Sequence, residues 1–243
     1  MKNAVTHDGS LPPDWALRSR KSLPQALWDL AGAPLRMVLL PDSANERLHM
    51  TSLRAERYAA VLPCLKGRVL DVGAGDNGLI RLYRQKLVRE NRVEDGADQS
   101  VGVDVVDWGG DTLTIESSDA LPFEDGSFDT VAFVACINHI PEREGALREA
   151  LRVLRPGGVL VATMIGRLIG DVGHAIWWYS EDKHRDVAEG EVMGIDKAEM
   201  VALIERAGFA NVRTRRFVYG MNILYRAEKG ARKPQRLEEV SRS

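Results

Sequence analysis

Cysteine is scarce in this sequence: the 243 residues include only two, Cys64 and Cys136. Both lie among apolar residues, so we expect reduced core thiols and no disulfide or cysteine metal framework. Long hydrophobic runs are also missing. The most apolar segments have the length of strands, well short of the roughly 20 residues that span a bilayer, and residues 1–8 lack the apolar stretch of a signal peptide. These absences predict a cytoplasmic protein with no integral membrane segment.

An excess of charge of one sign is absent as well. The chain has 33 Lys and Arg against 35 Asp and Glu, for a formal net charge of −2. A global basic field that could hold nucleic acid or an anionic membrane is therefore missing, and we expect no nucleic-acid partner. Hydrophobic residues make up 44% of the chain, which is enough for the core of one large domain.

Strand-like and helix-like patterns alternate after residue 62. Short apolar runs bounded by glycine and polar residues predict strands, and apolar positions at helical spacing predict the helices between them. The predicted strands are 68–72, 101–106, 112–116, 128–134, 159–164, 212–218 and 221–225, and the predicted helices are 78–90, 142–154 and 196–207. Repeated βα units predict a doubly wound, mostly parallel α/β sheet of seven strands that ends in an antiparallel hairpin.

The remaining segments are assigned by composition. Residues 15–62 have helical periodicity, with Leu23, Leu27 and Leu30 on one face, and predict an N-terminal helical cap. We interpret 15–229 as a single domain. Its flanks and its insertion are a mobile arm at 1–14, a lid at 165–195 and a charged tail at 230–243.

A glycine-rich turn follows the first predicted strand. Gly73-Ala74-Gly75-Asp76-Asn77-Gly78 has the G-x-G-x-x-G pattern, which also fits a dinucleotide site. Asp71 precedes the turn and Asp76 lies inside it, and both carboxylates would oppose a pyrophosphate at the start of the next helix. They favour a cationic ligand. S-adenosylmethionine, which carries an ammonium and a sulfonium and no phosphate, fits this charge pattern.

Three motifs occur in order between residues 68 and 164: Val69–Gly75, Leu121–Asp129 and Leu154–Leu160. Together they resemble the glycine motif, the entry to the fourth strand and the turn before the fifth strand of class I S-adenosylmethionine-dependent methyltransferases. The resemblance is greatest to the small-molecule subgroup that includes ubiquinone/menaquinone-biosynthesis methyltransferases. It implies a Rossmann-like methyltransferase fold, S-adenosyl-L-methionine as cofactor, and a small-molecule or amphiphilic acceptor.

The same resemblance implies the cofactor contacts. The acid and glycines of the first motif hold the methionine part, and an acid that ends the second strand binds the ribose hydroxyls. Asp104 fits this second role, with Asp107 as the alternative, and Asp119 is placed near the adenine amino group or serves as a turn cap. Asn77 departs from the family pattern, where many members have a third glycine. The expected cofactor residues are Asp71, Gly73, Ala74, Gly75, Asp104, Val105, Asp119, Ala120 and Cys136.

The acceptor is expected beyond the fourth and fifth strands. The segment that follows the fourth strand borders the transferred methyl group in the resembled family, and the aromatic stretch 174–186 has the composition of a lid or of a packed amphipathic helix. The candidates for a general base are His139, Tyr179, Glu181 and His184. The candidates for acceptor contacts are Asn138, His174, Trp177, Trp178 and Arg185. The histidines lack metal-site spacing, so no metal is expected.

Three other functions stay open. The glycine pattern alone permits a nicotinamide-dependent oxidoreductase, and the fold alone permits a non-catalytic binding protein. An RNA methyltransferase is the third, because Arg213, Arg215 and Arg216 form a local basic cluster. The balanced charge and the absence of an Asn/Asp-Pro-Pro-Tyr tetrapeptide disfavour this last alternative. The sequence indicates neither the acceptor atom nor the oligomeric state.

Overall fold

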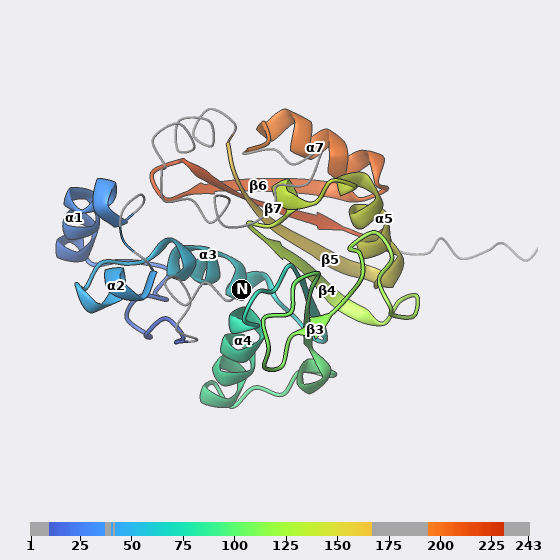
Figure 1. Cartoon of the computed structure of the whole chain (residues 1–243), viewed down its shortest axis with the longest axis horizontal. Coiled ribbons are helices and arrows are strands. Elements are labelled where there is room, and N and C mark those ends of the chain that lie inside the picture. The colour runs from blue at the N-terminus through green and yellow to red at the C-terminus, as the bar shows by residue number, and fades with distance from the viewer. Residues whose placement is uncertain (1–9, 37–39, 41, 167–193, 231–243) are drawn as a thin grey trace, which may run out of the picture.

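A seven-stranded sheet forms the centre of the protein (Figure 1). The computed structural model describes residues 10–36, 40, 42–166 and 194–230, and its strand order is β3-β2-β1-β4-β5-β7-β6. The strands are β1 Val69–Val72, β2 Val101–Asp104, β3 Leu113–Thr114, β4 Phe128–Val134, β5 Leu154–Ile165, β6 Ala210–Phe217 and β7 Asn222–Glu228. The first five strands run parallel, and β7 is antiparallel to both β5 and β6. The predicted mixed sheet with a terminal hairpin is confirmed.

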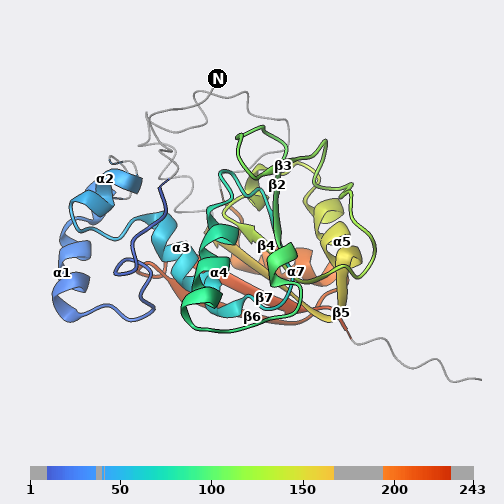
Figure 2. The ribbon, with the colours of Figure 1, turned by 90° about the horizontal axis from the view of Figure 1, so that it is seen from below.

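Helices cover both faces of this sheet (Figures 1 and 2). The helices of the described residues include α1 Leu23–Ala31, α2 Asp42–Arg47, α3 Leu53–Val61, α4 Gly78–Arg89, α5 Arg143–Val153 and α7 Lys197–Arg206, with short 3-10 turns at Leu62–Cys64, Ala97–Gln99 and Ile137–His139. α3 and α4 pack on one face, and α5 and α7 on the other. In β4, Ala132 packs on the face covered by α3 and α4, and Val131 and Phe133 pack on the face covered by α5 and α7. Burial on both faces explains the continuous apolar runs of the sequence.

Several strand boundaries differ from the prediction by one to five residues, and two of these differences have a visible local cause. β2 ends at Asp104 because its carboxylate accepts a hydrogen bond from the backbone N–H of Val106, which turns the chain. β5 begins at Leu154, five residues earlier than predicted, because Leu154 already pairs with Phe128. The pairing register then shifts, so that the next pair between β4 and β5 is Thr130 with Val159.

The described part of residues 15–62 includes α1, α2 and α3. α1 and α2 lie at one end of the molecule, and α3 lies between them and the sheet (Figures 1 and 2). α1 and α3 begin after the N-caps Ser22 and Ser52, whose hydroxyls accept hydrogen bonds from backbone N–H groups of the first turn. No helix in the described part of the chain is both long enough and apolar enough to cross a bilayer.

Candidate active site

The glycine turn joins β1 to α4 at the carboxyl edge of the sheet. The backbone N–H groups of Gly73 and Ala74 donate to the carbonyl oxygen of Val103 at 2.9 and 3.0 Å, which anchors the turn on β2. Gly73 and Gly75 have φ values of 71° and 55°. A methyl group on Gly73 would also lie 2.6 Å from the Cβ of Cys136. Both the conformation and the close approach therefore require glycine at position 73.

Asn77 occupies the place of the family's third glycine and keeps a left-handed backbone, with φ of 60°. Asparagine tolerates this conformation better than most residues. Its side-chain amide donates to the carbonyl oxygen of Asp111 at 3.1 Å, and the Thr112 hydroxyl donates to the carbonyl oxygen of Gly75 at 2.7 Å. Asn77 thus adopts the left-handed backbone conformation that glycine would also allow. Its side chain ties the turn to the loop before β3.

Asp71 lies at the end of β1 with only 2% of its surface exposed. Its Oδ1 atom has no hydrogen-bond partner among the described residues. Burial raises the pKa of this carboxyl well above its ordinary value, and the nearby Asp104 and Asp76 raise it further. A buried carboxylate without a partner is costly, and a cation placed beside it would offset that cost. The ammonium group of S-adenosylmethionine fits such a site.

Asp76 has a role in addition to the one inferred from the sequence. Its Oδ2 lies 3.1 Å from Arg81 Nη2 and 3.9 Å from Arg54 Nη1, and its Oδ1 accepts a hydrogen bond from the backbone N–H of Gly78. The carboxylate is therefore balanced by two arginines and caps α4. The preference for a cationic ligand at this turn depends mainly on the buried Asp71, and the contribution of Asp76 stays a prediction.

Asp104 connects the end of β2 to the glycine turn. Its Oδ2 accepts a hydrogen bond from the backbone N–H of Gly75 at 2.9 Å, and its Oδ1 accepts one from Val106 at 3.0 Å. A carboxylate offers about four acceptor positions, so two remain for ribose hydroxyls. Asp107 is exposed and accepts a hydrogen bond from the backbone N–H of Gly109 at 2.8 Å, as expected of a turn residue. This arrangement favours Asp104 for the ribose.

We expect Asp104→Ala to weaken S-adenosylhomocysteine binding by about 1–3 kcal/mol, because ribose hydroxyls and the Gly75 N–H would lose their acceptor. Asp107→Ala serves as the matched control and is expected to cost clearly less. Isothermal titration of the two variants measures the difference. The reverse order would assign the ribose to Asp107.

The residues expected near the adenine lie on the loop after β3. Asp119 is exposed, and the Ser117 hydroxyl donates to its carboxylate and accepts a hydrogen bond from its backbone N–H, so the side chain that caps this turn is Ser117. A Cβ on Gly145 of α5 would lie 2.9 Å from the Cβ of Asp119, so the loop contacts the start of that helix. Val105 and Ala120 are also exposed. An adenine contact at these residues stays a prediction.

Cys136, Asn138 and His139 follow β4 at the same edge. The Cys136 thiol donates to the carbonyl oxygen of Val72 at 2.9 Å, and burial, with Asp71 and Asp104 nearby, raises its pKa well above the ordinary value. It is therefore a protonated thiol that supports the glycine turn. Asn138 is buried, and its side-chain nitrogen lies 3.1 Å from Nε2 of the partly buried His139. The roles of both residues toward the acceptor stay predictions.

Two residues of α3 that were not predicted from the sequence lie at the site. Arg54 and Tyr58 are one helical turn apart, and both reach the glycine turn: Arg54 lies beside Asp76, and a Cβ on Gly78 would be 3.0 Å from the Tyr58 hydroxyl. Burial raises the pKa of Tyr58, and the charges of Asp71 and Asp76 add to this effect. Their spacing of four residues is the one sequence signal that places them on a common helix face.

Several predicted site residues lie outside the described part of the chain. They are His174, Trp177, Trp178, Tyr179, Glu181, His184 and Arg185. Most of the predicted lid, the first nine residues of the predicted arm and nearly all of the predicted tail are outside it too. Within residues 10–166 and 194–230, leaving out 37–39 and 41, no group of three His, Cys, Asp or Glu side chains is arranged to hold a metal.

The basic cluster predicted on β6 does not form one continuous face. Side chains alternate along a strand, so Arg213 and Arg215 point to one face of the sheet and Arg216 to the other. Arg215 turns toward α3 and donates to the carbonyl oxygen of Ala60 at 3.3 Å. A role of these arginines toward RNA is not tested by this arrangement.

Comparison with known proteins places the chain among methyltransferases. Residues 70–162 match a family described as methyltransferase domain. The 27-O-demethylrifamycin SV methyltransferase of Amycolatopsis mediterranei is 30% identical over 199 residues, which cover 77% of this chain and 66% of that protein. The ubiquinone/menaquinone biosynthesis C-methyltransferase UbiE of Vibrio campbellii is 26% identical, over 67% of this chain and 71% of the relative. The chain thus spans about two thirds of the length of these relatives.

Solved structures support the fold. A methyltransferase from Haloferax volcanii, solved with the Trm112 methyltransferase activator, superposes with a TM-score of 0.57 at 15% identity. The match covers 86% of this chain and 96% of that one. The CMeT domain of the citrinin polyketide synthase superposes with a TM-score of 0.51 at 16% identity, over 68% of this chain and 47% of the other. At these identities the likeness concerns the fold alone.

Proposed function

The chain belongs to the class I S-adenosylmethionine-dependent methyltransferases, and we propose that it methylates a small, partly apolar acceptor held at the carboxyl edge of the sheet. The observation that carries the proposal is the buried Asp71 carboxyl, whose Oδ1 lacks a hydrogen-bond partner among the described residues at the glycine turn. This position suits a ligand that is cationic at its amino-acid end and opposes a pyrophosphate. It therefore separates the proposed activity from nicotinamide chemistry.

The residues of the site would hold and align the reactants. Asp71 would bind the ammonium and Asp104 the ribose hydroxyls, and the turn from Gly73 to Gly75 would let the ligand approach the backbone. When bound, the cofactor supplies a methyl group on a positively charged sulfur. Asp71, Asp104 and the glycine turn would hold this methyl group in place for transfer to the acceptor atom. Alignment of this kind can contribute about 7–11 kcal/mol.

A base is needed only where the acceptor must lose a proton. Among the described candidates, His139 lies at the edge where β4 ends, with Asn138 beside its ring. Asn138 would orient the ring and contact the acceptor. Tyr179, Glu181 and His184 stay alternative bases on the proposed lid.

The relatives suggest the class of acceptor. One is named for a demethylated rifamycin, and another for ubiquinone and menaquinone biosynthesis. Staphylococcus aureus relatives, 26% identical over 56% of this chain, are named demethylmenaquinone methyltransferases. We take the acceptor here to be a ring compound with a hydroxyl group or an activated ring carbon and a large apolar part.

Two measurements test the proposal. Calorimetry is expected to show saturable binding of S-adenosylhomocysteine and none of NAD or NADP, and binding of the nicotinamide cofactors alone would overturn it. Transfer of labelled methyl from S-adenosylmethionine to a panel of hydroquinones and hydroxylated polyketides is expected to exceed transfer to structured RNA. Efficient transfer to RNA alone would restore the RNA alternative.

Trp178→Ala is expected to affect the acceptor more than the cofactor. If the aromatic stretch is a lid, affinity for S-adenosylhomocysteine should stay within about 1 kcal/mol, because no cofactor motif includes this residue. Turnover should fall much more, since a loosened lid admits water and misaligns the attacking atom. Titration, turnover and thermal melting of the same preparation decide the point. A melting temperature lowered by many degrees with normal activity of the folded fraction would make Trp178 a core residue.

A further inference from the structure

The helix α1 is amphipathic in the opposite sense to α4, α5 and α7. Leu23, Leu27, Trp28 and Leu30 of α1 are 73%, 58%, 49% and 53% exposed. At 100° per residue these side chains fall on one arc of the helix. The buried residue of α1 is Asp29, which is 0% exposed. A surface helix normally buries its apolar arc, so this orientation needs a physical reason.

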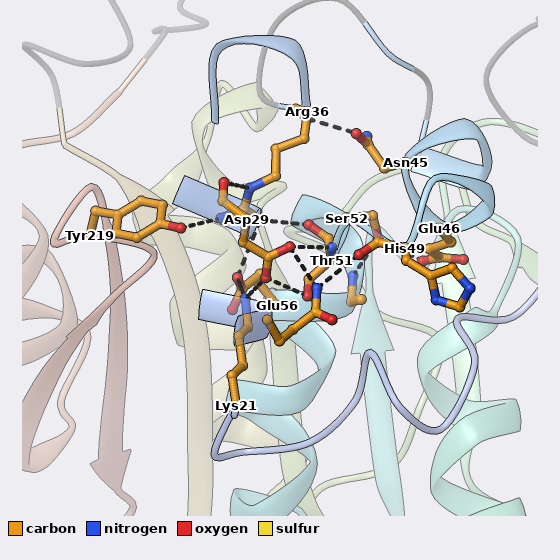
Figure 3. A network of polar contacts seen from close by, with 12 residues as sticks. Lys21, Asp29, Arg36, Asn45, Glu46, His49, Thr51, Ser52, Glu56 and Tyr219 are labelled. Atoms are coloured by element: carbon orange, nitrogen blue, oxygen red, sulfur yellow. Dashed lines mark hydrogen bonds and ion pairs between the residues drawn. The ribbon is translucent and has the colours of Figure 1, made fainter. Parts of the chain in front are cut away.

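Hydrogen bonds to Asp29 provide that reason (Figure 3). Its carboxylate accepts from the backbone N–H and the hydroxyl of Thr51 at 2.8 and 2.7 Å, from Lys21 Nζ at 2.6 Å, and from Gln25 Nε2 at 3.0 Å. Four donors satisfy the buried charge, and its pKa is held below the ordinary value by these contacts, although burial alone would raise it. The polar arc of α1 is therefore fixed to the segment that leads into α3.

Arg36 extends this network toward the sheet (Figure 3). Its guanidinium is buried, donates to the backbone carbonyl of Asp29 at 3.0 Å and to the Tyr219 hydroxyl at 3.1 Å, and lies 3.3 Å from Glu56. A roll of α1 that buried its leucines would break these buried contacts and leave charges without partners. The exposed apolar face is thus a fixed property of the fold.

The exposed charges of the segment that carries this face, residues 15–36, are positive. Residues 15–36 contain Arg18, Arg20, Lys21 and Arg36 and one acid, Asp29, which is buried and paired. Arg18 and Arg20 are exposed immediately before the helix. Every exposed charge on this segment is therefore a cation, although the whole chain is close to neutral. Two copies of the segment brought together would oppose like charges, whereas an anionic surface would be attracted.

We propose that α1 docks the protein on the surface of anionic phospholipid bilayers. The apolar arc of Leu23, Leu27, Trp28 and Leu30 would enter the boundary between headgroups and acyl chains, and Arg18 and Arg20 would contact the anionic headgroups. A helix with an apolar arc, an aromatic residue and flanking basic residues binds membrane interfaces in this way. The helix lies at the end of the molecule, so this contact leaves the sheet edge uncovered (Figures 1 and 2).

Flotation of the full chain with lipid vesicles tests the proposal. Vesicles of equal parts phosphatidylglycerol and phosphatidylcholine are expected to carry the protein, and pure phosphatidylcholine much less of it. Leu23→Ser with Leu27→Ser should lower partitioning roughly tenfold or more, because two apolar anchors are lost. Val88→Ser with Val93→Ser, also at exposed valines, is the matched control and should float like the parent.

A charge variant separates lipid docking from other uses of this face. Arg18→Gln with Arg20→Gln should lower partitioning roughly thirtyfold at low salt and leave S-adenosylhomocysteine binding unchanged. Failure of the parent protein to bind the anionic vesicles would overturn the proposal, as would equal flotation of the Leu23/Leu27 variant. A concentration-dependent dimer in sedimentation that this leucine variant abolishes, without vesicle binding, would assign the face to a second copy.

Discussion

Asp71→Asn is expected to weaken S-adenosylhomocysteine binding by about 2–5 kcal/mol and to stabilise the unliganded protein at pH values above the raised pKa of the parent carboxyl. The loss of affinity follows because the cofactor's ammonium would be left beside a neutral amide in a buried site. The gain in stability follows because the parent protein must hold a buried carboxyl with an unpartnered Oδ1 in its charged form. One substitution therefore moves the two quantities in opposite directions.

The pH dependence has a definite sign. The pKa of Asp71 is raised in the folded state by burial first and by two neighbouring carboxylates second. The folded state thus holds this proton more tightly than the unfolded chain, so the free energy of unfolding falls as pH rises from the ordinary pKa of aspartate to the raised one. Asparagine does not titrate, and the variant should lack this part of the decline. Above the raised pKa the variant should be the more stable protein.

Thermal melting across pH and calorimetry with S-adenosylhomocysteine measure both effects. Asp107→Asn removes an exposed carboxylate from the next loop and is the matched control, with little change expected in either quantity. Unchanged cofactor affinity in Asp71→Asn would remove this residue from the site. A lower melting temperature above the raised pKa would mean that the carboxylate has a stabilising partner.

Gly102→Ala is expected to displace the glycine turn and to lower S-adenosylhomocysteine affinity roughly tenfold or more. Gly102 pairs with Asp71 in the sheet, and a Cβ there would lie 2.3 Å from Asn77 Oδ1 and 2.6 Å from Ala74 Cβ. Contacts this short cannot be accepted without movement of the turn. Overpacking at a buried position of this kind also costs about 1–3 kcal/mol of stability.

Titration and thermal melting of the Gly102 variant give both numbers. Gly230→Ala is the matched control, because an added Cβ there meets nothing within 4 Å. It should bind the cofactor and melt like the parent protein. If Gly102→Ala also binds normally, the turn has room to shift without loss of function, and the proposed close fit is wrong.

The sheet and its order of elements could be predicted because the relevant signals are local. β4 was predicted at its observed bounds, since its apolar run is bounded by the turn residues Gly126 and Ser127 and is buried on both faces. The glycine turn was equally visible, because its left-handed residues must be glycine or a tolerant substitute such as Asn77.

The roles of single charges could not be predicted, because their partners come from distant parts of the chain. Asp76 is balanced partly by Arg54, which precedes it by more than 20 residues, and no sequence pattern announces this pair. The orientation of α1 has the same origin. Leu23, Leu27 and Leu30 were correctly placed on one face, but which face is buried depends on Thr51 and its hydrogen bonds to Asp29.

The hydrogen bond between Arg36 and Tyr219 spans 183 positions of the chain and sets an order of assembly. Tyr219 lies in the turn between β6 and β7, and β7 completes the sheet by pairing between β5 and β6. During synthesis the N-terminal helices emerge first, yet their last polar contact with the domain forms only after the final strands have left the ribosome. Contacts this distant in sequence form late and slow folding. The contact of Arg36 with Tyr219 therefore forms only after β6 and β7 have paired, although Arg36 precedes both strands in the chain.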